Sequence, residues 1–447
     1  MRMKAQNGRY AATLCAVVAS ALLSQSAVAA DWFELQGISP PKAPLFGVSG
    51  FIEPSLYLMN GTAAENRVPP INNIPRINLV APNYNQSNTL TILRARLMLR
   101  GNLNQHISYF LGGEVGNNAF TTVRGAYTPA LIDGHVTFSY IPGVRVETGI
   151  IRAPGPEDAM QGYMAYNYVV FPTAIGQLMQ QPFYDSSAAY KTAAIAGNPY
   201  LVSGANTLGT NAFRYPGVQV MDWFRFGHWE LAYAAMAGVY GSVAAGNQSS
   251  SPLYAARIQG SYIFGGAGPF RSDATAYLWY QHARPDLNGQ SYAMTREGIG
   301  FTYLQGYMHQ WGRRLKAEYI RGTGWISAPA AFSSAANLAP VLSQTQLYPG
   351  SGNKANGYDV EAGLFLTKHI EADVRYDYYD RLPNNPQQER IFKTWALALQ
   401  YHFTPLTKVM AGYYFRTLSV PYQPNPAANS ISSAVDNEFA MQAMISF

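Results

Sequence analysis

The last eleven residues of the chain, 437–447, alternate between two kinds of side chain. One set is apolar throughout and consists of Phe439, Met441, Ala443, Ile445 and Phe447. The residues between them are mixed in polarity. A period of two predicts a β-strand with one face in an apolar medium. Such a strand needs a neighbour on each edge, and closing the sheet into a barrel is one way to provide both. We therefore predict that this segment closes a barrel.

Fifteen earlier segments also read as strands, and short turns alternate with long loops between them. These segments are 46–59, 89–103, 106–115, 134–141, 144–152, 213–226, 229–240, 253–264, 274–282, 291–305, 313–321, 357–366, 370–379, 390–403 and 408–420. Soluble β-sandwiches would expose rows of Tyr, Leu and Phe to water, an aggregation hazard. The even total instead favours an all-β fold, a transmembrane antiparallel β-barrel of about 16 strands with both chain ends on the short-turn side.

The composition supports a membrane barrel. Charged residues make up 13% of the 447 residues, about half the usual globular fraction of roughly 25%. Aromatic residues also make up 13%, with 32 tyrosines, and there are 40 glycines. Beyond the N-terminal region, no stretch approaches the ~18 apolar residues that a membrane helix requires. The strands themselves are therefore expected to cross the membrane.

The first 29 residues have the pattern of a secretory signal peptide. A positively charged start is followed by the apolar residues 11–23 and by a small-x-small cleavage pattern at 27–29. The apolar run is short for a membrane anchor, the alternative interpretation. We predict a signal peptide at 1–29 and an outer-membrane β-barrel at 30–447.

The predicted leader contains the only cysteine, Cys15, so the mature chain is expected to have no disulfide and no cysteine metal site. The leader also carries three positive charges and no negative ones, which lowers the formal net charge from +6 to +3. This excess is too small to indicate nucleic-acid binding.

Catalytic motifs are absent from the sequence. It contains no Gly-x-Ser-x-Gly, P-loop, His-Glu-x-x-His or dinucleotide fingerprint after a strand. The seven histidines are scattered without metal-ligand spacing. Some outer-membrane lipases use a Ser/His pair, but these residues are widely dispersed here. We predict a protein that is not an enzyme and needs no cofactor or metal.

Basic residues recur on the face opposite the apolar one, which in a barrel is the lumen face. The predicted pore-lining set is Arg94, Arg96, Arg100, Arg145, Arg257, Arg314, Lys316, Arg375 and Arg416. An Arg facing lipid at the bilayer midplane would cost about 2–4 kcal/mol, which places these side chains inside. Fixed cations in a water-filled pore attract anions, and the planar guanidinium suits phosphate, sulfate and carboxylate.

The same face also carries acids, which leaves a second interpretation open. The acids assigned inward are Glu147, Glu318, Asp359, Glu361, Asp373 and Asp377. Ion pairs with them would make the cations a wall-stiffening network. Arg94, Arg96 and Arg100 have no acid in their own strand, which favours a role in selectivity. The alternation around Arg375 favours a wall network.

The connection at 153–211 is too long for a plain surface loop. Large barrels fill part of their lumen with such loops, so we predict that it folds inward and narrows the pore. The candidate constriction residues are Glu157, Asp158, Tyr163, Tyr166, Tyr184 and Lys191. The alternative is an external lid or a partner-contact loop.

Two stretches resemble the phosphate-selective porin O/P-type superfamily. Residues 94–103 resemble that family's early Arg-rich strand, and residues 144–154 resemble its strand before the pore loop. The resemblance implies a trimeric, anion-preferring outer-membrane channel. Members of the family carry clustered lysines in the pore region, whereas residues 153–211 of this chain contain one Lys and three acids.

These observations predict an outer-membrane porin for passive diffusion of small hydrophilic solutes, with a preference for anions. Its expected partners are outer-membrane lipid, small anions or other small solutes, and two further copies in a homotrimer. One alternative is a carbohydrate-type porin. Another is a structural barrel that sheathes a partner such as an electron-transfer cytochrome; since the chain has no Cys-x-x-Cys-His, the haem would belong to that partner.

Overall fold

A computed structural model describes most of the chain after the predicted leader. The described residues are 44–59, 89–118, 121, 127–181, 201–203, 211–241, 243, 251–287, 290–328, 344–386, 388–419, 421–422 and 437–447. The predicted signal peptide lies outside them. No helix within these ranges is long and apolar enough to cross a membrane.

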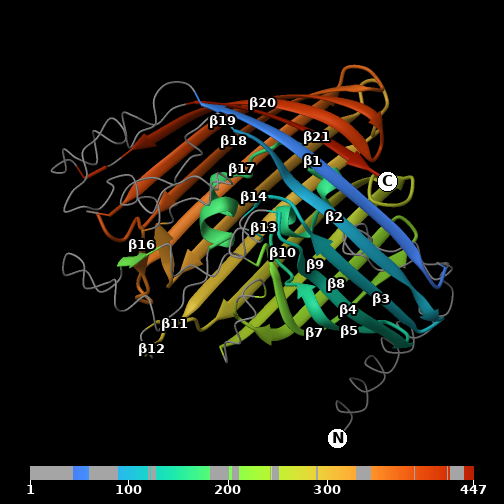
Figure 1. The fold of residues 1–447 in the computed structure, drawn as a ribbon, viewed down its shortest axis with the longest axis horizontal. Helices are drawn as coiled ribbons and strands as arrows, with labels where there is room; N and C mark the ends of the chain where they lie inside the picture. Colours follow the sequence, from blue (N-terminus) through green and yellow to red (C-terminus); the bar gives the residue numbers. More distant parts are fainter. Residues whose placement is uncertain are drawn as a thin grey trace, which may run out of the picture.

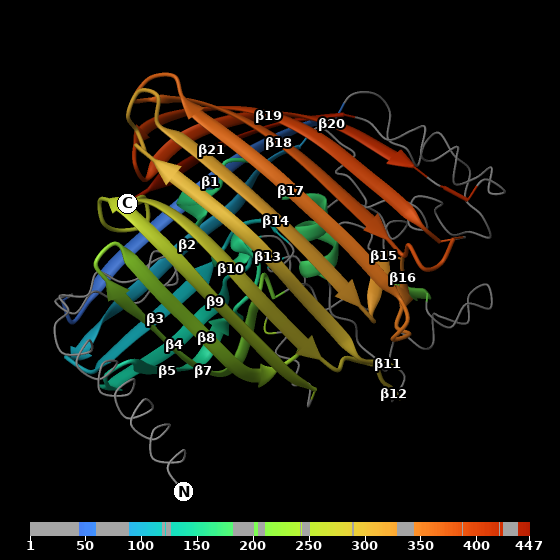
Figure 2. The ribbon, with the colours of Figure 1, turned by 180° about the vertical axis from the view of Figure 1, so that it is seen from behind.

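Sixteen antiparallel strands form a closed barrel, which confirms the predicted fold (Figures 1 and 2). Their bounds are β1 Gly47–Met59, β2 Thr89–Asn104, β3 Ile107–Glu114, β4 Ala130–Ile141, β5 Val144–Arg152, β7 Arg214–Phe226, β8 Trp229–Val239, β9 Pro252–Gly265, β10 Ser272–Ala283, β13 Met294–Gln305, β14 Arg313–Thr323, β17 Lys354–Phe365, β18 Ile370–Arg381, β19 Arg390–Thr404, β20 Thr407–Ser419 and β21 Glu438–Ser446. Each strand pairs with the next in sequence, and β21 pairs with β1.

The connections contain further short elements that the sequence pattern did not predict. Two small sheets lie outside the barrel order: β11 (Asp286–Leu287) with β12 (Gln290–Ser291), and β15 (Ile326–Ala328), β16 (Gln344–Tyr348) and β6 (Leu201–Ser203). The connection after β5 contains α5 (Glu157–Met160), the 3-10 helix η2 (Tyr163–Ala165) and the π-helix η3 (Ile175–Met179).

The last strand closes the barrel against the first, as predicted. Ile52 of β1 lies opposite Ile445 of β21. At the end of the seam, Gly50 and Phe447 exchange two backbone hydrogen bonds of 2.9 and 3.0 Å. A Cβ on Gly50 would lie 2.4 Å from the ring of Phe447, so only glycine fits beneath that ring.

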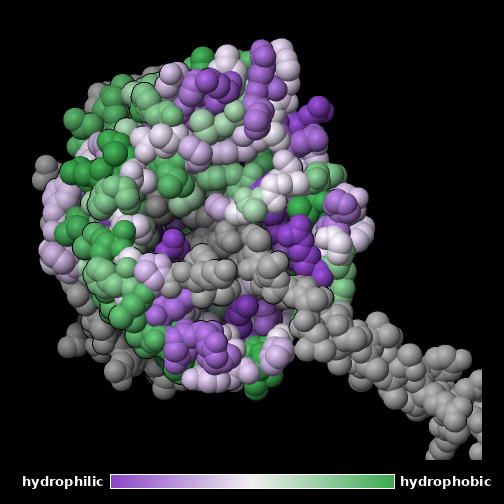
Figure 3. All heavy atoms as spheres, turned by 90° about the vertical axis from the view of Figure 1, so that its right-hand side faces the viewer, coloured by the Kyte–Doolittle hydropathy of each residue, from purple (hydrophilic) through white to green (hydrophobic). Residues whose placement is uncertain are grey.

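The outside of the barrel is apolar and its inside is charged. On β9, Tyr254 and Ile258 are exposed, whereas Leu253 and Arg257 on the opposite face are buried. The same alternation runs along β10, β17, β19 and β20. Viewed from one end, hydrophobic residues follow the left flank and hydrophilic ones gather nearer the middle (Figure 3). This arrangement is the reverse of that in a water-soluble protein, and it is stable only where hydrocarbon surrounds the barrel.

One strand begins earlier than its pattern predicts. The alternation indicated a start at Gly134, but β4 begins at Ala130. Opposite it on β3, Gly112 pairs with Asp133 while Gly113 pairs with Leu131, so Ile132 is an extra, bulged residue. A bulge shifts the alternation by one residue, which hides the first part of the strand from a period-two reading.

Candidate functional site

Residues 153–181, here called the inner segment, lie against the inner face of the barrel wall (Figure 1). Near its start, Arg257 on β9 donates to the carbonyl oxygen of Gly155 at 2.8 Å. Further along, Thr173 donates to the carboxylate of Asp377 on β18 at 2.7 Å. The inner segment therefore follows the wall across several strands and does not project away from it.

Two acids fix the start of the inner segment. Glu157 forms an ion pair with Arg257 at 2.6 Å, and its backbone N–H donates to Glu318 at 3.1 Å. Asp158 accepts from the ammonium of Lys316 at 2.6 Å. Burial raises the pKa of Asp158, and the nearby Lys316 opposes that rise. These contacts hold α5 against β9 and β14.

Lys316 lies at the centre of a buried acidic cluster. Its Nζ is 3.1 Å from Asp359 and 3.4 Å from Glu361, in addition to its contact with Asp158. Oxygens of Asp158, Asp359 and Glu318 lie within 4.8 Å of one another, a spacing that a metal ion could use. The ammonium group already supplies positive charge there, so the cluster is an anchor for the inner segment.

The middle of the inner segment reaches the opposite wall at β2. The rings of Tyr166 and Phe171 meet edge to face, with centroids 5.1 Å apart. The guanidinium of Arg94 lies 5.9 Å from each ring centroid. The Tyr166 hydroxyl donates to the carbonyl oxygen of Asp158, and its own carbonyl accepts from Lys408. Burial raises the pKa of Tyr166, while Arg94 acts to lower it.

Several backbone carbonyls and glutamine side-chain oxygens of the inner segment accept hydrogen bonds from arginines of the wall. Arg375 donates to the carbonyl of Val170 at 2.9 Å and lies over the ring of Tyr168. Arg296 on β13 donates to the carbonyl of Leu178, and Arg381 on β18 donates to Gln177. Guanidinium groups offer five donors and suit this role.

Four of the predicted pore-lining cations are covered, although they lie on the inner face. Arg257, Lys316 and Arg375 are buried beneath the inner segment, and Arg416 is buried beside Glu438. Their positive charges hold the inner segment or the wall, as the wall-network interpretation expects.

Arg94 and Arg96 have acidic partners on neighbouring strands. Arg94 lies 2.7 Å from Glu53 on β1, and Arg96 lies 2.6 Å from Glu114 on β3. In the register, Glu53 is directly opposite Arg94 and Glu114 is directly opposite Arg96. The sequence argument considered acids only within one strand and therefore missed both partners.

The remaining predicted cations differ in their surroundings. Arg145 lies 3.7 Å from Asp222 and 3.6 Å from the ring centroid of Trp223. Arg314 pairs with Glu371 at 2.9 Å. Arg100 is exposed near the short-turn end of β2, and no ion-pair partner for it exists among the described residues.

Sequence reasoning missed Arg152, which extends the cationic side of the site. It donates to the carbonyl oxygens of Gln161 at 2.9 Å and Ala159 at 3.3 Å, so β5 also holds the inner segment. Within the described ranges, no carboxylate forms an ion pair with it. Its position at the end of a predicted strand, just before the long connection, was the available signal.

In four ion pairs of the wall the arginine is more exposed than its acid, whereas Asp133 is more exposed than Arg214 and Asp273 more than Arg271. The pair of Arg257 with Glu157 on the inner segment also has the reverse order, since Glu157 is 14% exposed and Arg257 is 1% exposed. The four pairs with the more exposed arginine are Arg94 at 16% with Glu53 at 1%, Arg96 at 12% with Glu114 at 0%, Arg145 at 19% with Asp222 at 8%, and Arg314 at 12% with Glu371 at 0%.

Three predicted constriction residues cannot be placed in this geometry. Tyr184 and Lys191 lie outside the described residues. Tyr163 begins η2, but the structure does not describe its side chain. Of the predicted set, Glu157, Asp158 and Tyr166 are brought together on the inner segment.

No family model matches the chain, and no curated protein matches it. Solved structures of other proteins do match the chain. The anion-selective porin from Comamonas acidovorans covers 90% of this chain and 99% of its own, with a TM-score of 0.50 and 12% identity. Salmonella typhi OmpF, solved with daunomycin, covers 90% and 97%, with a TM-score of 0.50 and 11% identity. The chain thus has the porin fold, in the bacterial outer membrane.

Proposed function

We propose that the protein is a porin through which small hydrophilic solutes diffuse passively, with a preference for anions. The observation that carries the proposal is the order of exposure in three wall ion pairs. Arg94, Arg96 and Arg145 face the lumen side while their acids lie behind them. A solute near this wall meets guanidinium groups first, and fixed cations favour anions in a pore.

The geometry also suggests where selection occurs. Tyr166 and Phe171 bring the inner segment next to Arg94, and Arg152 holds the same segment from β5. We place the constriction between these residues and the wall of β2 and β5. Paired guanidinium donors match phosphate, sulfate and carboxylate, in line with the resemblance to phosphate-selective porins. The transport step is electrostatic and steric, without covalent chemistry.

A second candidate, diffusion of sugars, is favoured by one contact. The edge-to-face pair of Tyr166 and Phe171 offers aromatic surface beside Arg94. Aromatic faces suit the apolar side of a sugar ring. Liposome swelling with neutral sugars and with anions of similar size distinguishes the two functions, because only an electrostatic filter prefers the anions.

We further propose a homotrimer that packs through the outer face of β2 to β5. On that face the large exposed side chains at mid-height are aliphatic, for example Leu97, Leu111 and Leu131. The outer face of β14 to β20 carries the aromatic Tyr319 and Trp395 beside aliphatic side chains such as Leu397. β3 has only 8 residues, whereas a tilted strand needs about 9–11 to span the bilayer. Neighbouring copies would cover the short strands.

Planar-bilayer reversal potentials in a KCl gradient test the anion preference. The unmodified protein is expected to pass chloride more readily than potassium, and Arg94→Gln with Arg96→Gln is expected to reduce this preference several-fold. Lys393→Gln, an exposed cation on the outer face of β19, is the matched control and should change nothing. Cation preference in the unmodified protein would refute the proposal.

A further inference from the structure

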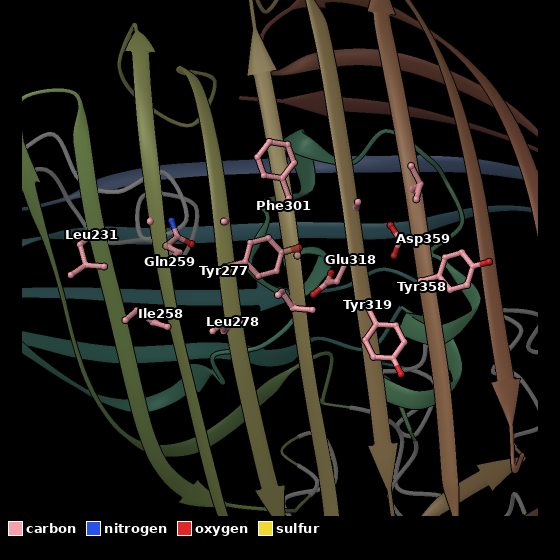
Figure 4. A pocket seen from close by; sticks show the side chains of 16 residues that line it. Leu231, Ile258, Gln259, Tyr277, Leu278, Phe301, Glu318, Tyr319, Tyr358 and Asp359 are labelled. Atoms are coloured by element: carbon pink, nitrogen blue, oxygen red, sulfur yellow. The ribbon is translucent and has the colours of Figure 1, made fainter. Parts of the chain in front are cut away.

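The outer face of the barrel has a hollow of about 750 Å³ that spans β8 to β17. The residues that line it on this face are apolar, and three of them, Gly260, Ala276 and Ala317, are small. Figure 4 shows the rings of Phe301 and Tyr319 pointing to opposite sides of the hollow. The hollow is therefore a groove between bulky side chains.

The strand register explains why the groove forms there. Ala276 of β10 lies between Gly260 of β9 and Phe301 of β13, and Phe301 lies opposite Ala317 of β14. One row across the sheet thus has small side chains on three of four strands. The next row toward the long-loop end includes Tyr319, so the surface rises again.

Charged residues on the same strand give the depth of the groove in the membrane. On β14, Arg313 and Arg321 lie on the outer face, each four residues from Ala317. Four residues of a strand tilted by about 45° correspond to a depth of ~9 Å, whereas half of the hydrocarbon core is about 15 Å. With Arg313 at the membrane interface, Ala317 lies about 9 Å below it, inside the hydrocarbon of that leaflet, where lipid chains or other transmembrane surfaces are the available occupants.

The two arginines differ in their partners. Arg321 lies 3.5 Å from Glu297 on the outer face of β13. Arg313 is exposed at the short-turn end of β14, and no carboxylate among the described residues pairs with it. The adjacent Trp311 is also exposed, as expected for a residue at the membrane interface. A cation at this level is complementary to a lipid phosphate.

We propose that this groove binds one acyl chain of an anionic phospholipid in the periplasmic leaflet, with its phosphate near Arg313. A second copy of the protein is the competing occupant. The face proposed for contacts between copies, at β2 to β5, lies elsewhere on the barrel wall. Arg313, on the same outer face of β14 and four residues from Ala317, offers a cation to a lipid phosphate, which a second copy of the protein does not need.

Photo-crosslinking tests this site. The protein is reconstituted in phosphatidylcholine–phosphatidylglycerol vesicles that contain a phosphatidylglycerol with a photoactivatable acyl chain. Peptides that carry Phe301 and Tyr319 should be labelled several-fold more than the peptide that carries Leu397 and Leu399, exposed apolar residues on β19. Equal labelling of all outer-face peptides would mean non-selective boundary lipid and would overturn the proposal.

Matched variants locate the contacts. Ala317→Leu or Ala276→Leu should fill the groove and reduce its labelling several-fold, while Ala372→Leu on the outer face of β18 should leave it unchanged. Arg313→Gln should reduce labelling by the anionic probe more than labelling by a phosphatidylcholine probe, because the choline cation offsets the charge of that lipid's phosphate. Retained heat-modifiable migration in gels confirms that each variant folds.

Two outcomes would overturn the assignment of the occupant. Loss of labelling with Arg321→Gln but not with Arg313→Gln would assign the groove to a lipid of the outer leaflet. Disulfide formation between copies through Ala317→Cys would assign it to a second copy. The channel function is measured separately, by reversal potentials, so either result leaves the proposed function standing.

Discussion

Arg94 of β2 and Glu53 of β1 lie 2.7 Å apart across neighbouring strands, yet they contact different environments. The arginine side chain is 16% exposed and the glutamate is 1% exposed. The acid therefore neutralises part of the positive charge from behind, while the guanidinium remains the group that a solute meets. Because the two charges are not equivalent to a passing ion, a paired arginine can still contribute to anion preference.

Removal of the hidden acid should increase the anion preference. Glu53→Gln keeps an acceptor for Arg94 but removes the buried negative charge, so the positive potential near β2 rises. We expect a larger chloride-to-potassium permeability ratio from reversal potentials. Glu297→Gln, on the outer face, is the control and should have no effect. An unchanged or smaller ratio would contradict the claim that Glu53 offsets part of the charge of Arg94 in the pore.

Loss of the ammonium of Lys316 should release the start of the inner segment. Lys316→Met would leave Asp158, Asp359 and Glu361 close together without their shared cation. Breaking a buried ion pair from one side typically costs about 3–5 kcal/mol. We expect a lower midpoint of thermal unfolding and a higher, noisier single-channel conductance. Lys393→Met, outside the barrel, should leave both values unchanged; an unaltered conductance in Lys316→Met would contradict the anchoring role.

The inner wall also depends on two glycines that lie under aromatic rings, Gly298 under Trp279 and Gly300 under Tyr277. A Cβ on Gly298 would come within 2.5 Å of the Trp279 ring, whose Nε1 donates to Glu318. Gly298→Val should therefore displace this ring and destabilise the barrel by about 1–3 kcal/mol, the usual cost of overpacking. Gly260→Ala has open space and should be neutral. Urea unfolding of both variants in the same detergent measures the difference, and equal midpoints would be incompatible with this packing.

The period-two pattern was sufficient to predict the barrel. Each strand separates hydrocarbon from the polar interior, so its residues alternate between apolar and polar side chains. β5 was predicted with its observed bounds, and β2 to within one residue. The pattern failed at Ile132, where a bulge shifts the alternation. It is also blind to elements such as η3, whose fold depends on tertiary contacts.

The candidate site was only partly accessible from the sequence for a related reason. Alternation indicates that Arg257 and Lys316 face inward, but not what covers them. Their partners Glu157 and Asp158 are far away in the chain and reach them only when the inner segment folds back. Exposure in the lumen is a property of this packing, so it could not be read from one strand at a time.

The phenol at the constriction should remain neutral at alkaline pH. Burial raises the pKa of Tyr166 above its ordinary value of 10.0. A raised pKa means that the uncharged form persists to higher pH, so no negative charge appears beside Arg94 as the solution approaches pH 10. Reversal potentials at pH 7 and near pH 9.5 should therefore show the same anion preference, and Tyr166→Phe should match the unmodified protein at both values. If the preference fell with pH in the unmodified protein but not in Tyr166→Phe, the phenol would be ionising in contact with water, and the inner segment would not enclose it against β2.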